Sequence, residues 1–178
     1  SFWHLDTKLV TGAGRRPGWN HTEAELLQAT AKVTIPFAKA LKNVIAPGLE
    51  GLVERLEGPD AAFLDVGCGV GMLSIEMARL WPGLRVVGID VWARSLGLAR
   101  DNVVEAGLAD RIELREQAGE TLGERETYDL VWIPSPFMSG EGARETARRA
   151  FEALRPGGWV LYALTRPSPD PLANAIAQ

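Results

Sequence analysis

The sequence predicts an α/β fold in which helices cover both faces of a doubly wound, mostly parallel sheet, giving three layers. Two observations lead to this prediction. Short apolar segments alternate with helical segments from residue 61 onward, and this alternation is typical of parallel sheets with right-handed crossovers. The apolar segments are also nearly continuous, as strands that are buried on both faces require.

The individual segments follow from their residue patterns. Strands are expected at Ala61–Val66, Leu84–Ile89, Arg111–Arg115, Tyr128–Ile133 and Trp159–Leu164. Helices are expected between them, where apolar residues recur at helical spacing, at Gly71–Leu80, Ala93–Ala106 and Gly142–Leu154. A glycine or a proline follows each of these helices closely and is expected to end it.

The first 58 residues are expected to form a helical extension or cap, ahead of a ligand-binding domain at 59–178. Asn20 or Thr22 is a suitable cap for the first of its helices, and Pro47-Gly48 is expected to end the second. The three helices predicted in this extension are Glu23–Ile35, Pro36–Ile45 and Leu49–Leu56.

Composition argues against several classes of protein. The net charge of the 178 residues is −4, whereas nucleic-acid-binding proteins usually carry a basic face. One cysteine, Cys68, cannot form an internal disulfide, and with His4 and His21 it is too scattered for a metal site. The chain shows neither a membrane-spanning run nor a signal peptide. We therefore expect a cytoplasmic protein with no metal and no nucleic-acid or membrane partner.

Two sets of charged residues are interpreted as structural. Arg144, Arg148 and Arg149 fall within one predicted helix, and a solvated helix face explains them better than a binding patch. Asp129 lies within the fourth strand and is expected to be a hydrogen-bonded structural acid.

A glycine-rich loop follows the first strand. Gly67, Gly69 and Gly71 allow the chain to turn sharply, to approach a ligand closely and to pack a helix tightly on the strand. The nicotinamide fingerprint G-x-G-x-x-G places its third glycine one residue later. Asp65, which precedes the loop, would repel a pyrophosphate and attract an ammonium group. The pattern D-x-G-x-G-x-G therefore favours a cationic ligand over a dinucleotide.

An acid also ends the second strand. Asp90 lies where a carboxylate is normally presented to ribose hydroxyls, and its oxygens can accept hydrogen bonds from both hydroxyls of one ribose. Trp92 follows two residues later. It lies against an adenine or packs within its own protein, and the sequence leaves both readings open.

Three segments resemble motifs of the class I S-adenosylmethionine-dependent methyltransferases. The strand and loop Phe63-Leu64-Asp65-Val66-Gly67-Cys68-Gly69-Val70-Gly71 resemble the first motif of that family, and Val87-Gly88-Ile89-Asp90 resembles the second. The turn Leu154-Arg155-Pro156-Gly157-Gly158-Trp159 is similar to the turn before the family's fifth strand. The resemblance covers residues 61 to about 165, and the order and spacing of the three segments make it specific.

The resemblance implies a sheet of order 3-2-1-4-5 with a terminal antiparallel hairpin. It also implies S-adenosylmethionine as cofactor and S-adenosylhomocysteine as product. The cofactor contacts that it implies are Asp65, Gly67, Gly69, Asp90 and Val91. Further expected cofactor contacts are Cys68, Trp92, Gln117, Ala118 and Ile133.

The chain departs from the family pattern at two places. Ala118 stands where an acid commonly binds the adenine amino group, so Gln117 or a backbone N–H is expected to take that role. The terminal hairpin has no counterpart after Leu164. The chain is therefore interpreted as a fragment of a larger parent protein, or as a protein whose hairpin is supplied by something else, as in an unusual homodimer.

The acceptor is expected over the carboxyl ends of the strands. The loop after the fourth strand lacks the acid or amide with which amine methyltransferases bind an amino group, because Ile133 stands there. The expected substrate pocket consists of Pro134, Ser135, Phe137, Met138 and Trp19. No general base is evident, and His21 and His4 are the candidates for this role.

These patterns favour an enzyme that transfers a methyl group to a small molecule by in-line displacement at the sulfonium. An RNA or protein methyltransferase is an alternative, which a basic face leading to the pocket would support. A cofactor-binding or interaction domain without catalysis is a third possibility. An aminopropyltransferase is disfavoured because the loop after the fourth strand has no acids for a polyamine. The glycine spacing disfavours a nicotinamide oxidoreductase.

Overall fold

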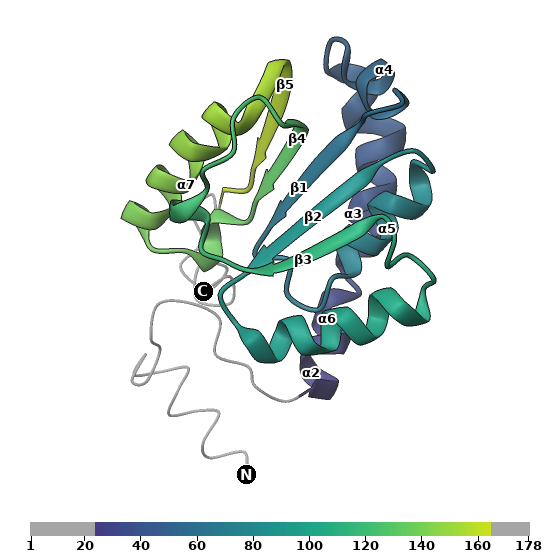
Figure 1. Ribbon diagram of the computed structural model, residues 1–178, viewed down its shortest axis with the longest axis vertical. Helices are drawn as coiled ribbons and strands as arrows, with labels where there is room; N and C mark the ends of the chain where they lie inside the picture. Colours follow the sequence, from purple (N-terminus) through teal and green to yellow (C-terminus); the bar gives the residue numbers. More distant parts are fainter. Residues whose placement is uncertain (1–23, 165–178) are drawn as a thin grey trace, which may run out of the picture.

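The computed structural model describes residues 24–164, which form one five-stranded sheet flanked by helices (Figure 1). The strands lie in the order β3-β2-β1-β4-β5, and all neighbouring pairs are parallel. Their bounds are β1 (Ala62–Val66), β2 (Arg85–Asp90), β3 (Ile112–Glu116), β4 (Tyr128–Ile133) and β5 (Leu154–Tyr162). The predicted fold class and strand order are confirmed.

Helices lie on both sides of this sheet. Figure 1 shows α7 beside β4 and β5, and α3, α4 and α5 on the opposite side of the sheet. The helical segments are α2 (Ala24–Ala31), α3 (Thr34–Ala40), η1 (Leu41–Ile45), η2 (Ala46–Gly48), α4 (Leu52–Leu56), α5 (Met72–Leu80), α6 (Ala93–Glu105), η3 (Gly119–Thr121), η4 (Ser135–Phe137) and α7 (Gly140–Ala153). No helix among these described residues is long and apolar enough to cross a membrane.

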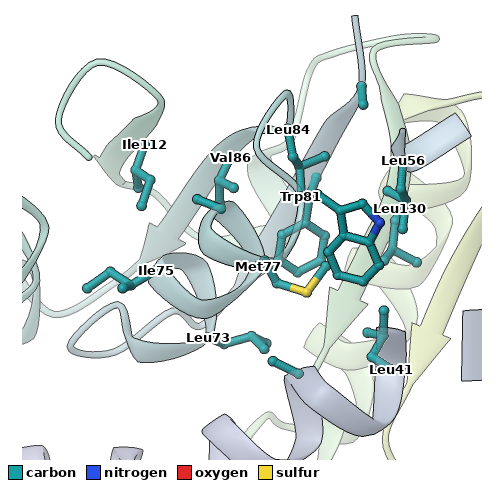
Figure 2. Packing of buried hydrophobic residues seen from close by; sticks show 14 of the residues in the cluster. Leu41, Leu56, Leu73, Ile75, Met77, Trp81, Leu84, Val86, Ile112 and Leu130 are labelled. Atoms are coloured by element: carbon teal, nitrogen blue, oxygen red, sulfur yellow. The ribbon is translucent and has the colours of Figure 1, made fainter. Parts of the chain in front are cut away.

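The apolar strands bury side chains on both faces, as their continuous patterns predict. Phe63 of β1 belongs to the larger core cluster, which includes Leu41 before the sheet and Met77 from α5 (Figure 2). Leu64 belongs to the second cluster, on the α7 side, with Ala150. Helices α3 and α4 therefore share a core with the sheet.

The N-terminal helices differ from the predicted ones. The first ends at Ala31 and a new helix begins at Thr34, two residues before Pro36. This start places Pro36 in the first turn of α3, where a missing N–H leaves no helical hydrogen bond unmade. The predicted third helix begins only at Leu52, after a left-handed Gly51 with φ of 70°.

Strand β5 begins five residues earlier than predicted. Leu154 pairs with Tyr128, and the pairing then continues from Trp159 opposite Leu130. The irregularity between the two pairs includes Gly157, whose φ of 77° suits glycine. The segment read as a turn from the sequence is therefore an irregular part of the strand.

Asp129 is a structural acid, as predicted. Its side chain is buried, and its Oδ2 accepts hydrogen bonds from the Ala62 N–H at 2.9 Å and from Arg155 at 2.7 Å. Arg55 of α4 lies 3.6 Å from the other oxygen. The carboxylate therefore ties β4 to β1, β5 and α4.

Candidate functional site

The loops after β1, β2, β3 and β4 converge on one cavity of about 890 Å³. Their convergence follows from the topology, because the carboxyl ends of parallel strands meet at one edge of the sheet. Helices α2 and α3 supply a further wall through Leu27, Ala31 and Phe37. The volume is near the upper end of the range of about 300–1,000 Å³ that is typical of small-molecule sites.

The glycine loop forms one side of this cavity. Gly67, Gly69 and Gly71 have φ of 65°, 56° and 78°, in the left-handed region that disfavours side chains. A Cβ on Gly71 would lie 3.3 Å from the Cβ of Ala99, so this glycine allows α5 and α6 to pack closely. A Cβ on Gly69 would meet nothing within 4 Å, so at Gly69 it is the backbone conformation that calls for glycine.

Asp65 is a buried acid at the end of β1. It is 1% exposed, lines the cavity, and accepts a hydrogen bond of 2.7 Å from the Ser74 hydroxyl. Burial raises the pKa of the Asp65 carboxyl, the Ser74 hydrogen bond lowers it and the charge of Asp90 raises it, and together they bring it to about 7. An acid that burial makes costly to ionise is well suited to a cationic group, because the cation favours the carboxylate.

Asp90 is held by the backbone of two loops. Its Oδ2 accepts a hydrogen bond of 2.8 Å from the Gly69 N–H, and its Oδ1 accepts one of 2.9 Å from the Trp92 N–H. Each carboxylate oxygen has a second lone pair. The side chain is thereby fixed against the glycine loop while it keeps accepting capacity for hydroxyl groups.

Most of the predicted site residues line this cavity. Besides Asp65 and Asp90, the lining includes Gly67, Cys68, Gly69, Val91, Trp92, Gln117, Pro134, Phe137 and Met138. Trp19, His4 and His21 lie outside the described residues. Ala118, Ile133 and Ser135 are not among the residues that line the cavity, and their contacts stay predictions.

The reason for each exception is local. Ile133 is fully buried in the core cluster on the α7 side of the sheet. The Ser135 hydroxyl donates to the carbonyl oxygen of Ala163, which turns it toward the end of β5. After β3, Gln117, Gly119 and Glu120 line the cavity and Ala118 does not.

An aromatic pair that was not predicted lies in the cavity wall. Phe37 of α3 and Trp132 of β4 both line it, with ring centroids 4.5 Å apart and planes tilted by 43°. Trp132 pairs in register with Asp65 on the neighbouring strand. Residues in register point to the same face of a sheet, so the aromatic pair lies beside the buried acid.

The only cysteine of the chain is in the glycine loop. Cys68 is buried, and burial, with the charges of Asp65 and Asp90, raises the pKa of its thiol well above the usual value. A thiol reacts as the thiolate. We therefore expect the folded chain at neutral pH to react with a disulfide reagent at least about tenfold more slowly than the urea-unfolded chain. Equal rates, followed by absorbance, would contradict this description of Cys68.

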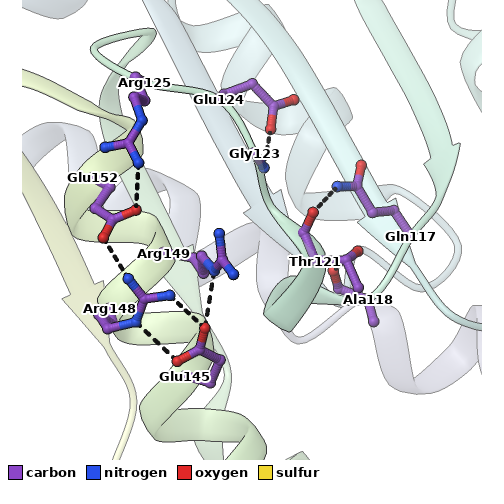
Figure 3. A network of polar contacts seen from close by, with 10 residues as sticks. All are labelled: Gln117, Ala118, Thr121, Gly123, Glu124, Arg125, Glu145, Arg148, Arg149 and Glu152. Atoms are coloured by element: carbon purple, nitrogen blue, oxygen red, sulfur yellow. Dashed lines mark hydrogen bonds and ion pairs between the residues drawn. The ribbon is translucent and has the colours of Figure 1, made fainter.

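Two of the three arginines of α7, Arg148 and Arg149, belong to an ion-pair network, and Arg144 is exposed, in line with the predicted solvated helix face. Arg148 pairs with Glu145 and Glu152, and Arg149 pairs with Glu145 at 2.9 Å (Figure 3). Glu152 also lies 3.5 Å from Arg125. The charges of this helix face are therefore largely balanced within the chain.

Comparisons with known proteins agree on one family. A family model described as a methyltransferase domain matches residues 63–158. A ubiquinone biosynthesis O-methyltransferase of Leptothrix cholodnii is 34% identical over 130 residues, covering 72% of this chain and 53% of that protein. A U6 snRNA (guanine-N(2))-methyltransferase of Bos taurus is 32% identical over 130 residues, covering 70% of this chain and 26% of that protein. The chain thus spans about half the length of the first of these relatives and less of the second.

A solved structure supports the fold independently. The S-adenosylmethionine-dependent methyltransferase of Geobacter sulfurreducens, in complex with S-adenosylhomocysteine, is similar with a TM-score of 0.53 and 23% identity. The similarity covers 89% of this chain and 54% of that one.

Proposed function

Because the chain belongs to the class I S-adenosylmethionine-dependent methyltransferases, we propose that it transfers the methyl group of this cofactor to a small-molecule acceptor. The observation that carries the proposal is the arrangement of the cavity. The buried Asp65 and the half-buried Asp90 both line it, and the aromatic pair Phe37 and Trp132 lies beside Asp65.

The residues present fit this cofactor. The Asp65 carboxyl would face its ammonium group, since burial keeps the pKa of Asp65 at about 7 and a cation would favour the ionised form. Asp90 would accept from the ribose hydroxyls with the lone pairs that Gly69 and Trp92 leave free. Val91, Trp92 and Gln117 line the cavity after β2 and β3 and would enclose the adenine.

The chemistry requires little from the protein beyond placement. When bound, the cofactor supplies a methyl group already activated on a sulfonium centre. The chain's own residues would orient the acceptor in line with that group and keep water out. Phe37 and Trp132 offer an apolar surface for this purpose, and Phe137 and Met138 extend it from the loop after β4.

The apolar lining of the cavity favours a small acceptor over RNA. Apolar and aromatic side chains supply most of the lining around Trp132, which is typical of small-molecule sites. The ubiquinone biosynthesis O-methyltransferases among the relatives support the same choice. The RNA methyltransferase among them makes RNA the alternative to be tested.

A radiolabel experiment distinguishes these acceptors. The chain is incubated with methyl-labelled S-adenosylmethionine and either a panel of small hydroxyl-bearing aromatic compounds, catechol among them, or total RNA, and label is counted in the organic extract and in the acid precipitate. The proposal expects transfer to a member of the panel and none to RNA above a no-enzyme control. Label that appears only in RNA would overturn the small-molecule assignment.

The aromatic wall gives a sharper prediction. Replacing Trp132 by leucine should lower transfer to the small acceptor at least about tenfold, because about 1–3 kcal/mol of apolar and ring contact is lost. Binding of S-adenosylhomocysteine should stay within about threefold, since acceptor contacts are removed and cofactor contacts are kept. Trp132→Phe should recover part of the activity, and Phe151→Ala, an exposed aromatic on α7, should change neither quantity. Equal losses of activity and cofactor binding would contradict an acceptor role for Trp132.

A further inference from the structure

Two side-chain amides join three separate segments near the cavity. Gln28 of α2 and Asn102 of α6 are both half-buried and exchange a pair of hydrogen bonds. The Gln28 Nε2 donates to the Asn102 Oδ1 at 2.9 Å, and the Asn102 Nδ2 donates back to the Gln28 Oε1 at 3.1 Å. The Asn102 Nδ2 also donates to the carbonyl oxygen of Val70 at 2.8 Å. Val70 lies in the glycine loop, between Gly69 and Gly71.

The Val70 carbonyl oxygen determines which atoms of the amide pair donate and which accept. A carbonyl oxygen only accepts, so Asn102 must present its NH₂ group to it. The second hydrogen of that NH₂ is then left for Gln28, and the Asn102 Oδ1 is left to accept from Gln28. Both donors of Asn102 are therefore used, one on the glycine loop and one on α2.

The stability of helix α2 depends on its contacts with other segments. It has eight residues, and an isolated helix of that length is not stable in water. Leu27 is buried, and Leu27 and Ala31 line the cavity. Helix α2 therefore forms part of the cavity wall, and contacts with other segments hold it in place. Such segments typically open locally at a low free-energy cost.

We propose that Gln28 and Asn102 form a latch, in which Asn102 couples the position of α2 to the conformation of the glycine loop. A ligand that fixes the loop fixes the Val70 carbonyl, and through Asn102 it holds α2 closed over the cavity. The coupling is reciprocal, so closing α2 also strengthens binding in the loop. Both amides are positioning residues, and the inference does not depend on which acceptor the enzyme uses.

The test combines hydrogen exchange with ligand binding. Exchange of the backbone amides at 24–31 is measured with and without S-adenosylhomocysteine, for the wild type, Gln28→Ala, Asn102→Ala and the double variant. The ligand should slow exchange at 24–31 in the wild type and fail to do so in Gln28→Ala. The dissociation constant should rise about three- to tenfold in Gln28→Ala, up to about 1.4 kcal/mol.

A double-mutant test distinguishes the latch from a role in which Asn102 only supports the glycine loop. In the Asn102→Ala background, Gln28→Ala should add nothing further, because its partner is already gone. Gln28→Met keeps the size of the side chain without the amide and should behave like Gln28→Ala with an unchanged melting temperature. Asn43→Ala, an exposed amide in η1, is the matched control and should match the wild type.

Two outcomes would overturn the latch. One is a Gln28→Ala variant with wild-type affinity and wild-type protection of 24–31. The other is a loss of affinity in Asn102→Ala that Gln28→Ala and Gln28→Met do not share. If the wild type binds no S-adenosylhomocysteine, the cofactor assignment fails, and faster exchange of 24–31 in unliganded Gln28→Ala still decides whether the amide pair holds α2.

Discussion

Asp65→Asn is expected to weaken cofactor binding by about thirty- to a hundredfold while making the unliganded protein more stable near pH 8. The carboxyl is 1% exposed, and burial raises its pKa to about 7, so at pH 8 the wild type maintains a desolvated charge. Asparagine removes that charge, but it also removes the group that would pair with the ligand's ammonium. A buried charged hydrogen bond is worth about 2–3 kcal/mol, which corresponds to the expected loss of affinity.

The sign of the stability change follows from proton linkage. The folded-state pKa of Asp65 is raised from 3.8 to about 7, so between these values the folded chain binds more protons than the unfolded chain. This contribution to stability is fully present below about pH 4 and is lost as the pH rises through about 7. Since one pKa unit is about 1.4 kcal/mol, the wild type should lose about 2–4 kcal/mol relative to Asp65→Asn between pH 4 and pH 8.

Urea unfolding across this pH range measures the difference, and titration calorimetry with S-adenosylhomocysteine measures the affinity. Affinity of the wild type should rise with pH up to about 7 and then level off, because the ammonium group binds the carboxylate form. Asp110→Asn removes an exposed acid and should reproduce the wild-type curves. Parallel stability curves for the wild type and Asp65→Asn would refute the raised pKa, and unchanged affinity would refute the ammonium contact.

The sequence predicted the parts of the site that depend on local pattern. The acids Asp65 and Asp90 lie at the ends of strands whose apolar runs are plain in the sequence, and the glycines of the loop follow the first of these strands. Most of the predicted strand bounds agree with the observed ones to within one residue, because a strand that is buried on both faces needs a nearly continuous apolar run. The predicted start of β5 was wrong, because the strand is irregular between its first pair and the next, and only the pairing with β4 defines where it begins.

The features that the sequence did not reveal depend on strand register and on contacts between residues far apart in the chain. Ile133 was expected at the cofactor, yet its neighbour Trp132 faces the cavity, because Trp132 stands opposite Asp65 in the sheet. Adjacent strand residues point to opposite faces, so the register determines which of the two side chains lines the cavity. The partnership of Gln28 and Asn102 joins residues 74 positions apart, and no local pattern could reveal it.

Asp90→Ala is expected to weaken binding of S-adenosylhomocysteine by about ten- to a hundredfold, for two separable reasons. The carboxylate would accept from the ribose hydroxyls, and it also holds the Gly69 and Trp92 N–H groups in the unliganded chain. Losing a charged hydrogen bond to the ligand is worth about 1.5–3 kcal/mol. Releasing the two N–H groups loosens the glycine loop before any ligand arrives, which adds an ordering cost on binding.

Asp90→Asn tests the same two roles with a side chain of nearly the same size. An amide has one accepting oxygen, so its NH₂ group would face either the Gly69 or the Trp92 N–H and leave it unpaired. The variant should therefore resemble Asp90→Ala in affinity, and exchange of the Gly69 or Trp92 amide should quicken in both. Glu116→Ala is the matched control, because this exposed acid ends β3 opposite Asp90 in the register. If the Asp90 variants bound like the wild type, the ribose would have to lie elsewhere, and the two backbone hydrogen bonds would mark a structural acid only.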